Sequence, residues 1–119
     1  RSYFYNFAKY LIKANKKVPE RFLQKIATNA EYSYYFAINL IFKNQEVPER
    51  FLQRIATDKI WSYHFAVYLM KKNLEVPEII KQKSKEHRDH LFTENYFERI
   101  YNDVSNLSSK KHLKQVKNK

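Results

Sequence analysis

The chain of 119 residues contains no glycine and no cysteine, and it has only three prolines. Without cysteine it can form neither disulfides nor thiolate metal sites, which is typical of proteins from a reducing compartment. We therefore expect an intracellular location, cytoplasmic by default. Long apolar runs are missing as well, because the best of them, residues 34–42, includes Asn39 and is far shorter than the roughly 18 residues of a membrane span. We expect no membrane association.

The motifs of most enzymes are also missing. The sequence has no glycine-rich phosphate loop, no nucleophile motif and no repeated pair of carboxylates. His87 and His90 lie three residues apart with acidic neighbours, but this spacing is more typical of a solvated charged turn than of a metal site. We expect no catalysis, no cofactor, no bound metal and no small-molecule substrate. Because the chain begins at Arg1 without a methionine, we also expect a fragment or a processed product of a longer protein.

What the sequence does contain is a repeat. The tripeptide Val-Pro-Glu begins at Val18, Val47 and Val76, at intervals of 29 residues. The apolar positions ahead of it recur in the same register, as Tyr3, Tyr5, Phe7, Ala8 and Leu11, then Tyr32, Tyr34, Phe36, Ala37 and Leu40, then Trp61, Tyr63, Phe65, Ala66 and Leu69. The positions behind it recur as Phe22, Leu23, Ile26 and Ala27, then Phe51, Leu52, Ile55 and Ala56, before they drift to Ile80, Lys81, Ser84 and Lys85. Three repeats are predicted, over about residues 2–30, 31–59 and 60–88.

Each repeat is predicted to be a pair of helices, because its apolar residues follow spacings of three and four rather than two. Proline at positions 19, 48 and 77 suits the first turn of the second helix, where an amide hydrogen would be unpaired anyway. Asn15, Asn44 and Asn73 precede these prolines and replace glycine in a left-handed helix cap. Between repeats, the next long helix is capped either by a capping box of Thr28 and Glu31 or by the equivalent residues Asn29 and Asp58.

These features predict an all-α fold, an α-solenoid of three helix-turn-helix repeats. The middle long helix is apolar nearly all round, which indicates that it is covered on both sides. Residues 91–104 keep helical spacing without the repeat signature and are predicted to form a capping helix, so that the helical-repeat domain spans residues 1–104. Residues 105–119 contain five lysines and no acidic residue, which is the composition of a basic tail.

The aromatic-aromatic-Ala-x-x-Leu helix, followed by Asn, Val-Pro-Glu and Ile-Ala-Thr-Asn or Ile-Ala-Thr-Asp, resembles short helical repeats of uncharacterised phage and bacterial proteins. The resemblance covers about residues 2–85 and implies a helical-repeat fold without a shared activity. In architecture the repeats are similar to HEAT and tetratricopeptide solenoids, although their period is shorter.

Aromatic residues offer a first set of candidate contacts. Because the repeated stripe Tyr3, Tyr5, Tyr32, Tyr34, Trp61 and Tyr63 has helical spacing, it favours core packing over a stacking platform for single-stranded nucleic acid. Three tyrosines fall outside that stripe and are the predicted exposed contacts for a protein partner: Tyr10, Tyr35 and Tyr68.

Basic residues offer a second set. Lys25, Arg54 and Lys83 share one repeat position, and Arg21 and Arg50 share another, so stacked repeats would align them as a basic ladder. With Lys110, Lys111 and Lys114 of the tail they are the predicted contacts for nucleic acid or an acidic partner, although a merely solvated face explains them equally well. The net charge is +11 and is concentrated at the ends, because residues 1–31 and 105–119 each carry +5.

The sequence therefore predicts a non-catalytic interaction module that docks through basic surfaces onto nucleic acid or a nucleoprotein assembly. The alternative is a protein-protein adaptor or inhibitor, of a kind that a phage could encode, which binds a protein partner through its helical faces.

Overall fold

The computed structural model describes residues 2–88, which form six α-helices. Long and short helices alternate along the chain: α1 (Ser2–Lys13), α2 (Glu20–Ile26), α3 (Ala30–Phe42), α4 (Glu49–Ile55), α5 (Lys59–Lys71) and α6 (Glu78–Ser84). The predicted all-α class is confirmed. The predicted capping helix at 91–104 and the basic tail at 105–119 lie outside the described residues.

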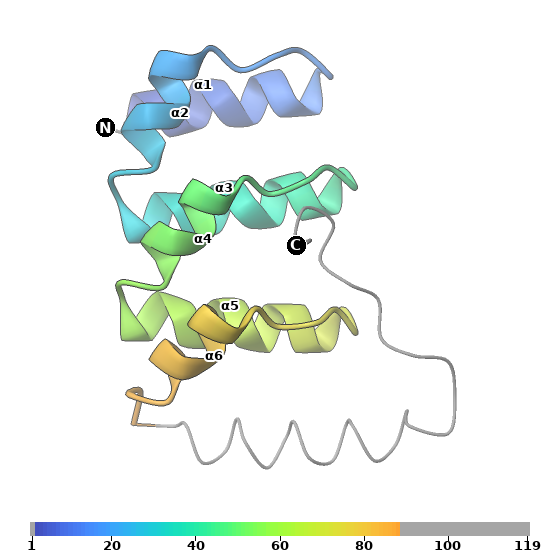
Figure 1. Ribbon diagram of the computed structural model, residues 1–119. Helices are drawn as coiled ribbons and strands as arrows, with labels where there is room; N and C mark the ends of the chain where they lie inside the picture. Colours follow the sequence, from blue (N-terminus) through green and yellow to red (C-terminus); the bar gives the residue numbers. More distant parts are fainter. Residues whose placement is uncertain (1, 89–119) are drawn as a thin grey trace.

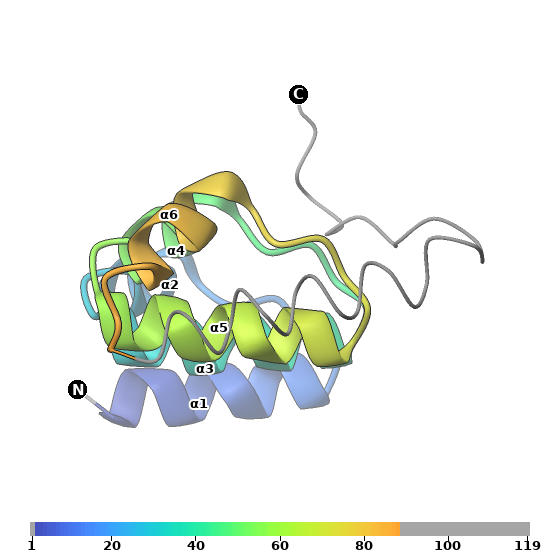
Figure 2. The same cartoon turned by 90° about the horizontal axis from the view of Figure 1, so that it is seen from below.

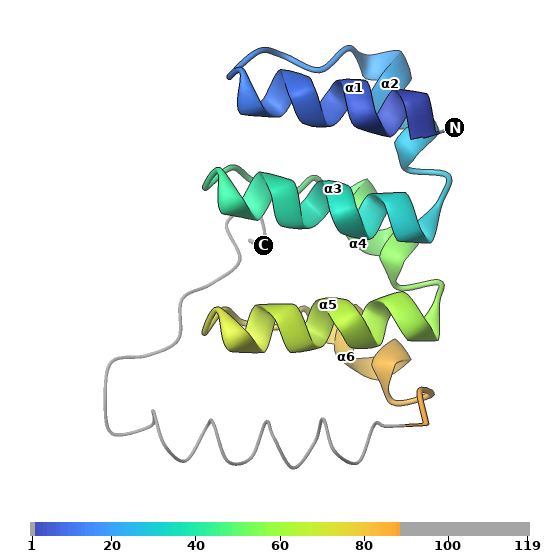
Figure 3. The same cartoon turned by 180° about the vertical axis from the view of Figure 1, so that it is seen from behind.

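The six helices are arranged in two layers. The long helices α1, α3 and α5 lie side by side, and each is followed by a short helix that packs against it (Figures 1 and 3). Seen from below, α2, α4 and α6 all lie on the same side of the long helices (Figure 2). We call α1 with α2 the first pair, α3 with α4 the second pair and α5 with α6 the third pair. The second pair therefore lies between the other two.

The chain reverses after each long helix through an asparagine with left-handed backbone geometry. Asn15, Asn44 and Asn73 have φ values of 60°, 58° and 57°, as the sequence predicted. In the first turn, the amide of Lys16 donates to the carbonyl of Leu11 at 2.8 Å, and the same 2.8 Å bond recurs in the other two turns. This is the Schellman arrangement, which satisfies carbonyls at the end of a helix.

The starts of the helices differ in two details from the sequence expectation. Pro19, with φ −58° and ψ 146°, occupies the N-cap and not the first turn of α2, as do the prolines ahead of α4 and α6. Of the two caps considered for the next long helix, the structure uses Asn29, whose side chain accepts the amide of Tyr32 at 2.8 Å. Thr28 forms no capping box, because its hydroxyl donates backwards to the carbonyl of Lys25 at 2.6 Å.

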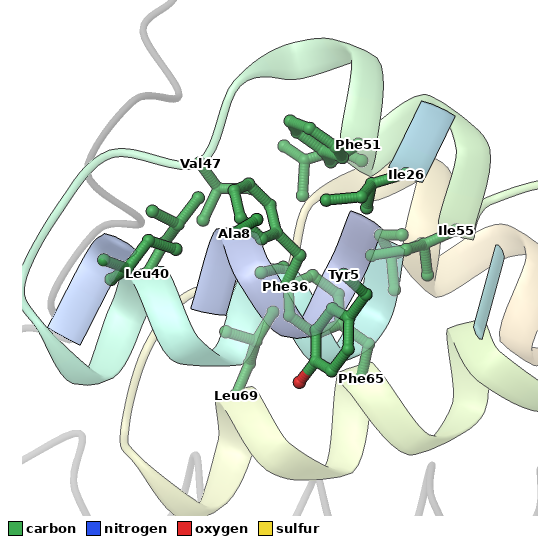
Figure 4. Close-up of a cluster of buried hydrophobic side chains, with 14 of the residues drawn as sticks. Tyr5, Ala8, Ile26, Phe36, Leu40, Val47, Phe51, Ile55, Phe65 and Leu69 are labelled. Carbon is green, nitrogen blue, oxygen red and sulfur yellow. The ribbon is translucent and has the colours of Figure 1, made fainter. Parts of the chain in front are cut away.

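The hydrophobic core runs continuously through all three pairs (Figure 4). Phe36 and Phe51 meet at its centre, with ring centroids 4.9 Å apart. Ala8, Ala37 and Ala66 are fully buried, as expected for positions where helices approach closely. The hydroxyls of two buried serines, Ser33 on α3 and Ser62 on α5, donate to the carbonyls of Ile26 and Ile55. These hydrogen bonds join α3 and α5 to the short helix that precedes each of them.

The middle helix is covered by both neighbouring pairs except at its end. Phe36 is only 1% exposed, as expected for a helix that is covered on both sides, whereas Phe42, in the last turn of α3, is 76% exposed. The reason lies in the repeat register, because Lys13 and Lys71 take the same position in α1 and α5 and are exposed too. The neighbouring pairs do not reach this position. In residues 2–88, no helix has the length and apolar character that crossing a membrane requires.

Candidate functional site

The five cations of the predicted basic ladder all lie on the short helices. Arg21 and Lys25 are on α2, Arg50 and Arg54 on α4, and Lys83 on α6. The five residues therefore share the layer of short helices, which lies on one side of the long helices (Figure 2). The contacts of the individual side chains, however, separate the ladder into two groups.

Arg50 is bound by a carboxylate of the first pair. Its Nη2 atom donates to Oε1 of Glu20 at 3.0 Å, and Nη1 donates to the second carboxylate oxygen. The hydrogen bond from Arg50 holds the pKa of the exposed Glu20 carboxyl below its ordinary value and raises the pKa of the guanidinium. Arg50 therefore links α2 to α4, and its charge is already compensated.

Arg54 and Lys83 are engaged as well. The Nε atom of Arg54 donates to the carbonyl of Ala27 at 2.8 Å, so that Arg54 satisfies a carbonyl at the end of α2. Lys83 lies 3.2 Å from the carboxylate of Glu86 on its own pair. Arg50, Arg54 and Lys83 thus donate hydrogen bonds to other residues of the chain. The acceptors of Arg50 and Arg54 lie in or just after α2 of the preceding pair, and that of Lys83 lies just after α6.

Arg21 and Lys25 form the second group. Both are exposed, and neither forms an ion pair with another of the residues 2–88. Each lies over an aromatic ring of the first pair: the Arg21 guanidinium carbon is 5.1 Å from the centroid of Phe22, and the Lys25 nitrogen is 5.9 Å from that of Phe4. These cations are held near aromatic surface while their charge faces solvent.

A row of exposed aromatic side chains lies on α1. Tyr3, Phe7 and Tyr10, which we call the exposed stripe, have 67%, 39% and 59% of their surface accessible. Their rings are nearly parallel, with 7° between Tyr3 and Phe7 and 14° between Phe7 and Tyr10. Phe22 makes edge contacts with both Tyr3 and Phe7, at 6.4 and 5.4 Å. Through Phe22, the exposed stripe is continuous with the Arg21 side chain.

The expectation that Tyr3 belongs to the core is wrong. Tyr32 and Phe36 of α3 are the repeat equivalents of Tyr3 and Phe7. Both belong to the core, and the Tyr32 ring stacks on Tyr5 of the first pair with their centroids 5.5 Å apart. On α1 the same face is the outer side of the first pair, where Phe22 of α2 contacts Tyr3 and Phe7 but no neighbouring pair in residues 2–88 covers it. The repeat pattern predicts which face of the helix is apolar, but the neighbour decides whether that face is buried.

The predicted aromatic contacts outside the core differ from one another. Tyr10 is exposed as predicted, but Tyr35 and Tyr68 are half-buried against the core. The Tyr35 ring lies 6.1 Å from Tyr5 and 5.7 Å from Trp61, which fill the junctions of α3 with α1 and α5. Burial raises the pKa of Tyr68 above its ordinary value.

An open cleft of about 540 Å³ lies between α4 and α6. Of the carboxylates that line it, Glu78 accepts a hydrogen bond from Gln82, and Glu86 pairs with Lys83. Across the described residues, no group of three histidines and carboxylates comes together as a metal site would require. His87 stacks on Tyr63 at 4.2 Å, and His90 lies outside the described residues, as do Lys110, Lys111 and Lys114.

No protein-family model matches the sequence, and no curated protein or solved structure shows detectable similarity to it. Within residues 2–88, the first helix pair is where Arg21 and Lys25 and the exposed aromatic rings are found together.

Proposed function

We propose that the chain is a non-catalytic α-solenoid of 29-residue helix-pair repeats that docks onto nucleic acid, alone or within a nucleoprotein assembly. The observation that carries this proposal is the state of Arg21 and Lys25, which are exposed, without an ionic partner in residues 2–88, and located in the most basic part of the described chain. Cations that are not compensated internally are the ones available to phosphate groups.

The charge around these two residues supports an anionic partner. Residues 1–31 carry a net +5, and one of their two acidic residues, Glu20, is neutralised by Arg50. Lys13, Lys16 and Lys17 are exposed at the far end of the same pair. The first pair therefore presents cations at both of its ends, and its one acidic residue, Glu20, is compensated by Arg50.

The proposal predicts steep dependence of binding on salt, because each phosphate contact releases counterions. If the first pair contacts about three or four phosphates, log K against log salt has a slope of roughly −3 for a duplex. The tail lysines Lys110, Lys111 and Lys114 would make the slope steeper. We expect double charge reversal, Arg21→Glu with Lys25→Glu, to weaken binding at least about tenfold and to flatten the slope by roughly two.

The test is a titration of a labelled mixed-sequence oligonucleotide, single-stranded and as duplex, at several salt concentrations. The matched control is Lys59→Glu with Lys71→Glu, which reverses two exposed charges on α5 and so changes the net charge equally. An equal loss in both double variants would show that only net charge matters. Absence of binding at low salt would overturn the proposal.

The second candidate is a protein-protein adaptor, and the exposed stripe is the observation that favours it, because exposed aromatic residues often anchor protein interfaces. An adaptor binds with weak salt dependence and tolerates the reversal at Arg21 and Lys25. The same titration therefore separates the two functions.

A further inference from the structure

The exposed stripe is a candidate docking surface, because three large aromatic side chains are exposed within residues 2–88 while Tyr32 and Phe36, the equivalents of Tyr3 and Phe7 on α3, belong to the core. Its surroundings are polar and positive. Lys13 lies three residues beyond Tyr10 and is exposed, so that a cation continues the stripe along α1. At the other end, Phe22 connects the stripe to Arg21.

A second copy of the chain fits this surface poorly. Aromatic side chains bury about 150–250 Å² each, so the accessible fractions of Tyr3, Phe7 and Tyr10 amount to roughly 250–400 Å². Stable interfaces bury about 800 Å² on each partner. Two first pairs would also bring together two surfaces of net +5. Area and charge both argue against self-association here.

An unpaired nucleic acid strand fits better, since it supplies flat rings and negative charge together. Its bases stack on aromatic side chains while a basic rim follows the backbone. In a duplex the faces of the bases are covered by their neighbours, so a duplex can use the cations but not the rings. Successive rings of the exposed stripe are nearly parallel, at centroid distances of 6.4 and 6.1 Å, which suits a row of bases along α1.

We propose that the exposed stripe of Tyr3, Phe7 and Tyr10 stacks with the bases of a single strand whose phosphates lie against Arg21, Lys25 and Lys13. The first pair then prefers single-stranded to double-stranded nucleic acid. This inference rests on the proposed nucleic-acid binding and specifies its substrate class.

The experiment measures the dissociation constants of the full chain for an oligothymidine of about 12 nucleotides and for a duplex of the same length. Oligothymidine is suitable because its bases stack weakly on one another. The test variant is Tyr3→Ser with Tyr10→Ser, which removes the two most exposed rings of the stripe and leaves Phe7 on Phe22. Two variants serve as controls: Tyr3→Phe with Tyr10→Phe, which keeps both rings, and Phe42→Ser, which removes an exposed ring from α3.

We expect the parent chain to bind oligothymidine more tightly than the duplex. Loss of one stacked ring weakens binding about fivefold or more, so the double serine variant should lose at least that factor on oligothymidine and less than about twofold on the duplex. The double phenylalanine variant and Phe42→Ser should stay within about twofold of the parent on both. Circular dichroism melting of each variant shows that the helices are retained.

Other results overturn the inference in distinguishable ways. If single strand and duplex bind equally, and only the reversal at Arg21 and Lys25 weakens them, stacking is refuted and the proposed function survives. An equal loss in Phe42→Ser refutes the location of the site. If neither oligonucleotide binds at low salt, both the inference and the proposed function fail, and the exposed stripe is left to a protein partner.

Discussion

Replacement of Phe36 by alanine tests the central claim about packing, that α3 is the core element which holds the first and third pairs. Phe36 is 1% exposed, and its ring lies 4.9 Å from that of Phe51 on the partner helix α4. Because α3 contacts α1, α2, α4 and α5, a cavity at Phe36 weakens all three pairs at once.

The expected magnitude follows from the contacts. Full burial of a large apolar side chain contributes about 1.5–3 kcal/mol, and the pairing with Phe51 adds about 0.5–1.5 kcal/mol. With the cavity that remains, Phe36→Ala should cost about 3–5 kcal/mol. A folded unit of this size has roughly 4–13 kcal/mol of stability in total. The variant should therefore lose at least about a quarter of this stability.

The assay is thermal melting followed by circular dichroism, with urea unfolding to obtain the free energy. For a domain of this size, 1 kcal/mol shifts Tm by about 4–8 °C, so Phe36→Ala should melt at least about 12 °C below the parent. Phe42→Ala is the matched control on the same helix, and because its side chain is 76% exposed it should stay within about 0.5 kcal/mol. A Tm of Phe36→Ala within about 3 °C of the parent would refute the assignment of α3 as the central element.

Two further predictions concern the turns and the link between pairs. Asn44→Gly should be neutral or stabilise by up to about 1 kcal/mol, because glycine adopts φ 58° without strain. Asn73→Gly should stabilise more, by about 1–2 kcal/mol, because it also removes a buried Oδ1 atom that has no hydrogen-bond partner; urea unfolding of both variants checks the order. The prediction for the link uses Arg50→Met, which removes the partner of Glu20. Since the folded pKa of Glu20 lies below its ordinary value of 4.5, the link stabilises above that pH and its contribution is lost as pH falls through the folded pKa. The Tm difference between parent and Arg50→Met should thus be present near neutral pH and vanish in acid, and a difference that grows on acidification would contradict this sign.

The helices and their turns were predictable because each is specified by residues close together in sequence. Asparagine is the residue besides glycine that best tolerates left-handed geometry, so Asn15 alone located the end of α1. The buried positions were predictable too, since Phe36 and Ala37 follow helical spacing in a repeat where all copies agree. Two details at the helix starts required the structure. The prolines occupy the N-cap and not the first turn, and the choice between Thr28 and Asn29 as cap was open because both hydroxyl and amide oxygens can accept the same amide hydrogens.

The state of the basic residues was not predictable in this way. The repeat register placed Arg21 and Arg50 at equivalent positions, yet only Arg50 has the carboxylate of a preceding pair within reach. The equivalent of the Glu20–Arg50 ion pair one repeat later would join Glu49 to residue 79. Residue 79 is an isoleucine, and the Glu49 carboxylate accepts a hydrogen bond from Gln53 instead. Whether the charge of a ladder arginine is compensated depends on a second residue 30 positions away, as for Arg50 and Glu20. The repeat position of the arginine alone does not show whether a carboxylate stands there.

Exposure at the first pair follows from the same reasoning. Tyr3 and Tyr32 are the same residue type at the same repeat position, but Tyr32 stacks on Tyr5 of the preceding helix, whereas Tyr3 is 67% exposed. A repeat position thus encodes an apolar face that packs on the preceding pair, and within residues 2–88 the first pair has no such neighbour to cover it. Since α2 also carries Arg21 and Lys25, whose side chains have neither an ion pair nor a hydrogen bond with another of the residues 2–88, aromatic surface and available charge coincide on the first pair. Replacing Tyr3 by serine therefore leaves the contacts between the helix pairs unchanged and tests the proposed binding surface alone. We expect such variants to bind oligothymidine more weakly than the parent chain, while their Tm shifts by no more than about 4 °C.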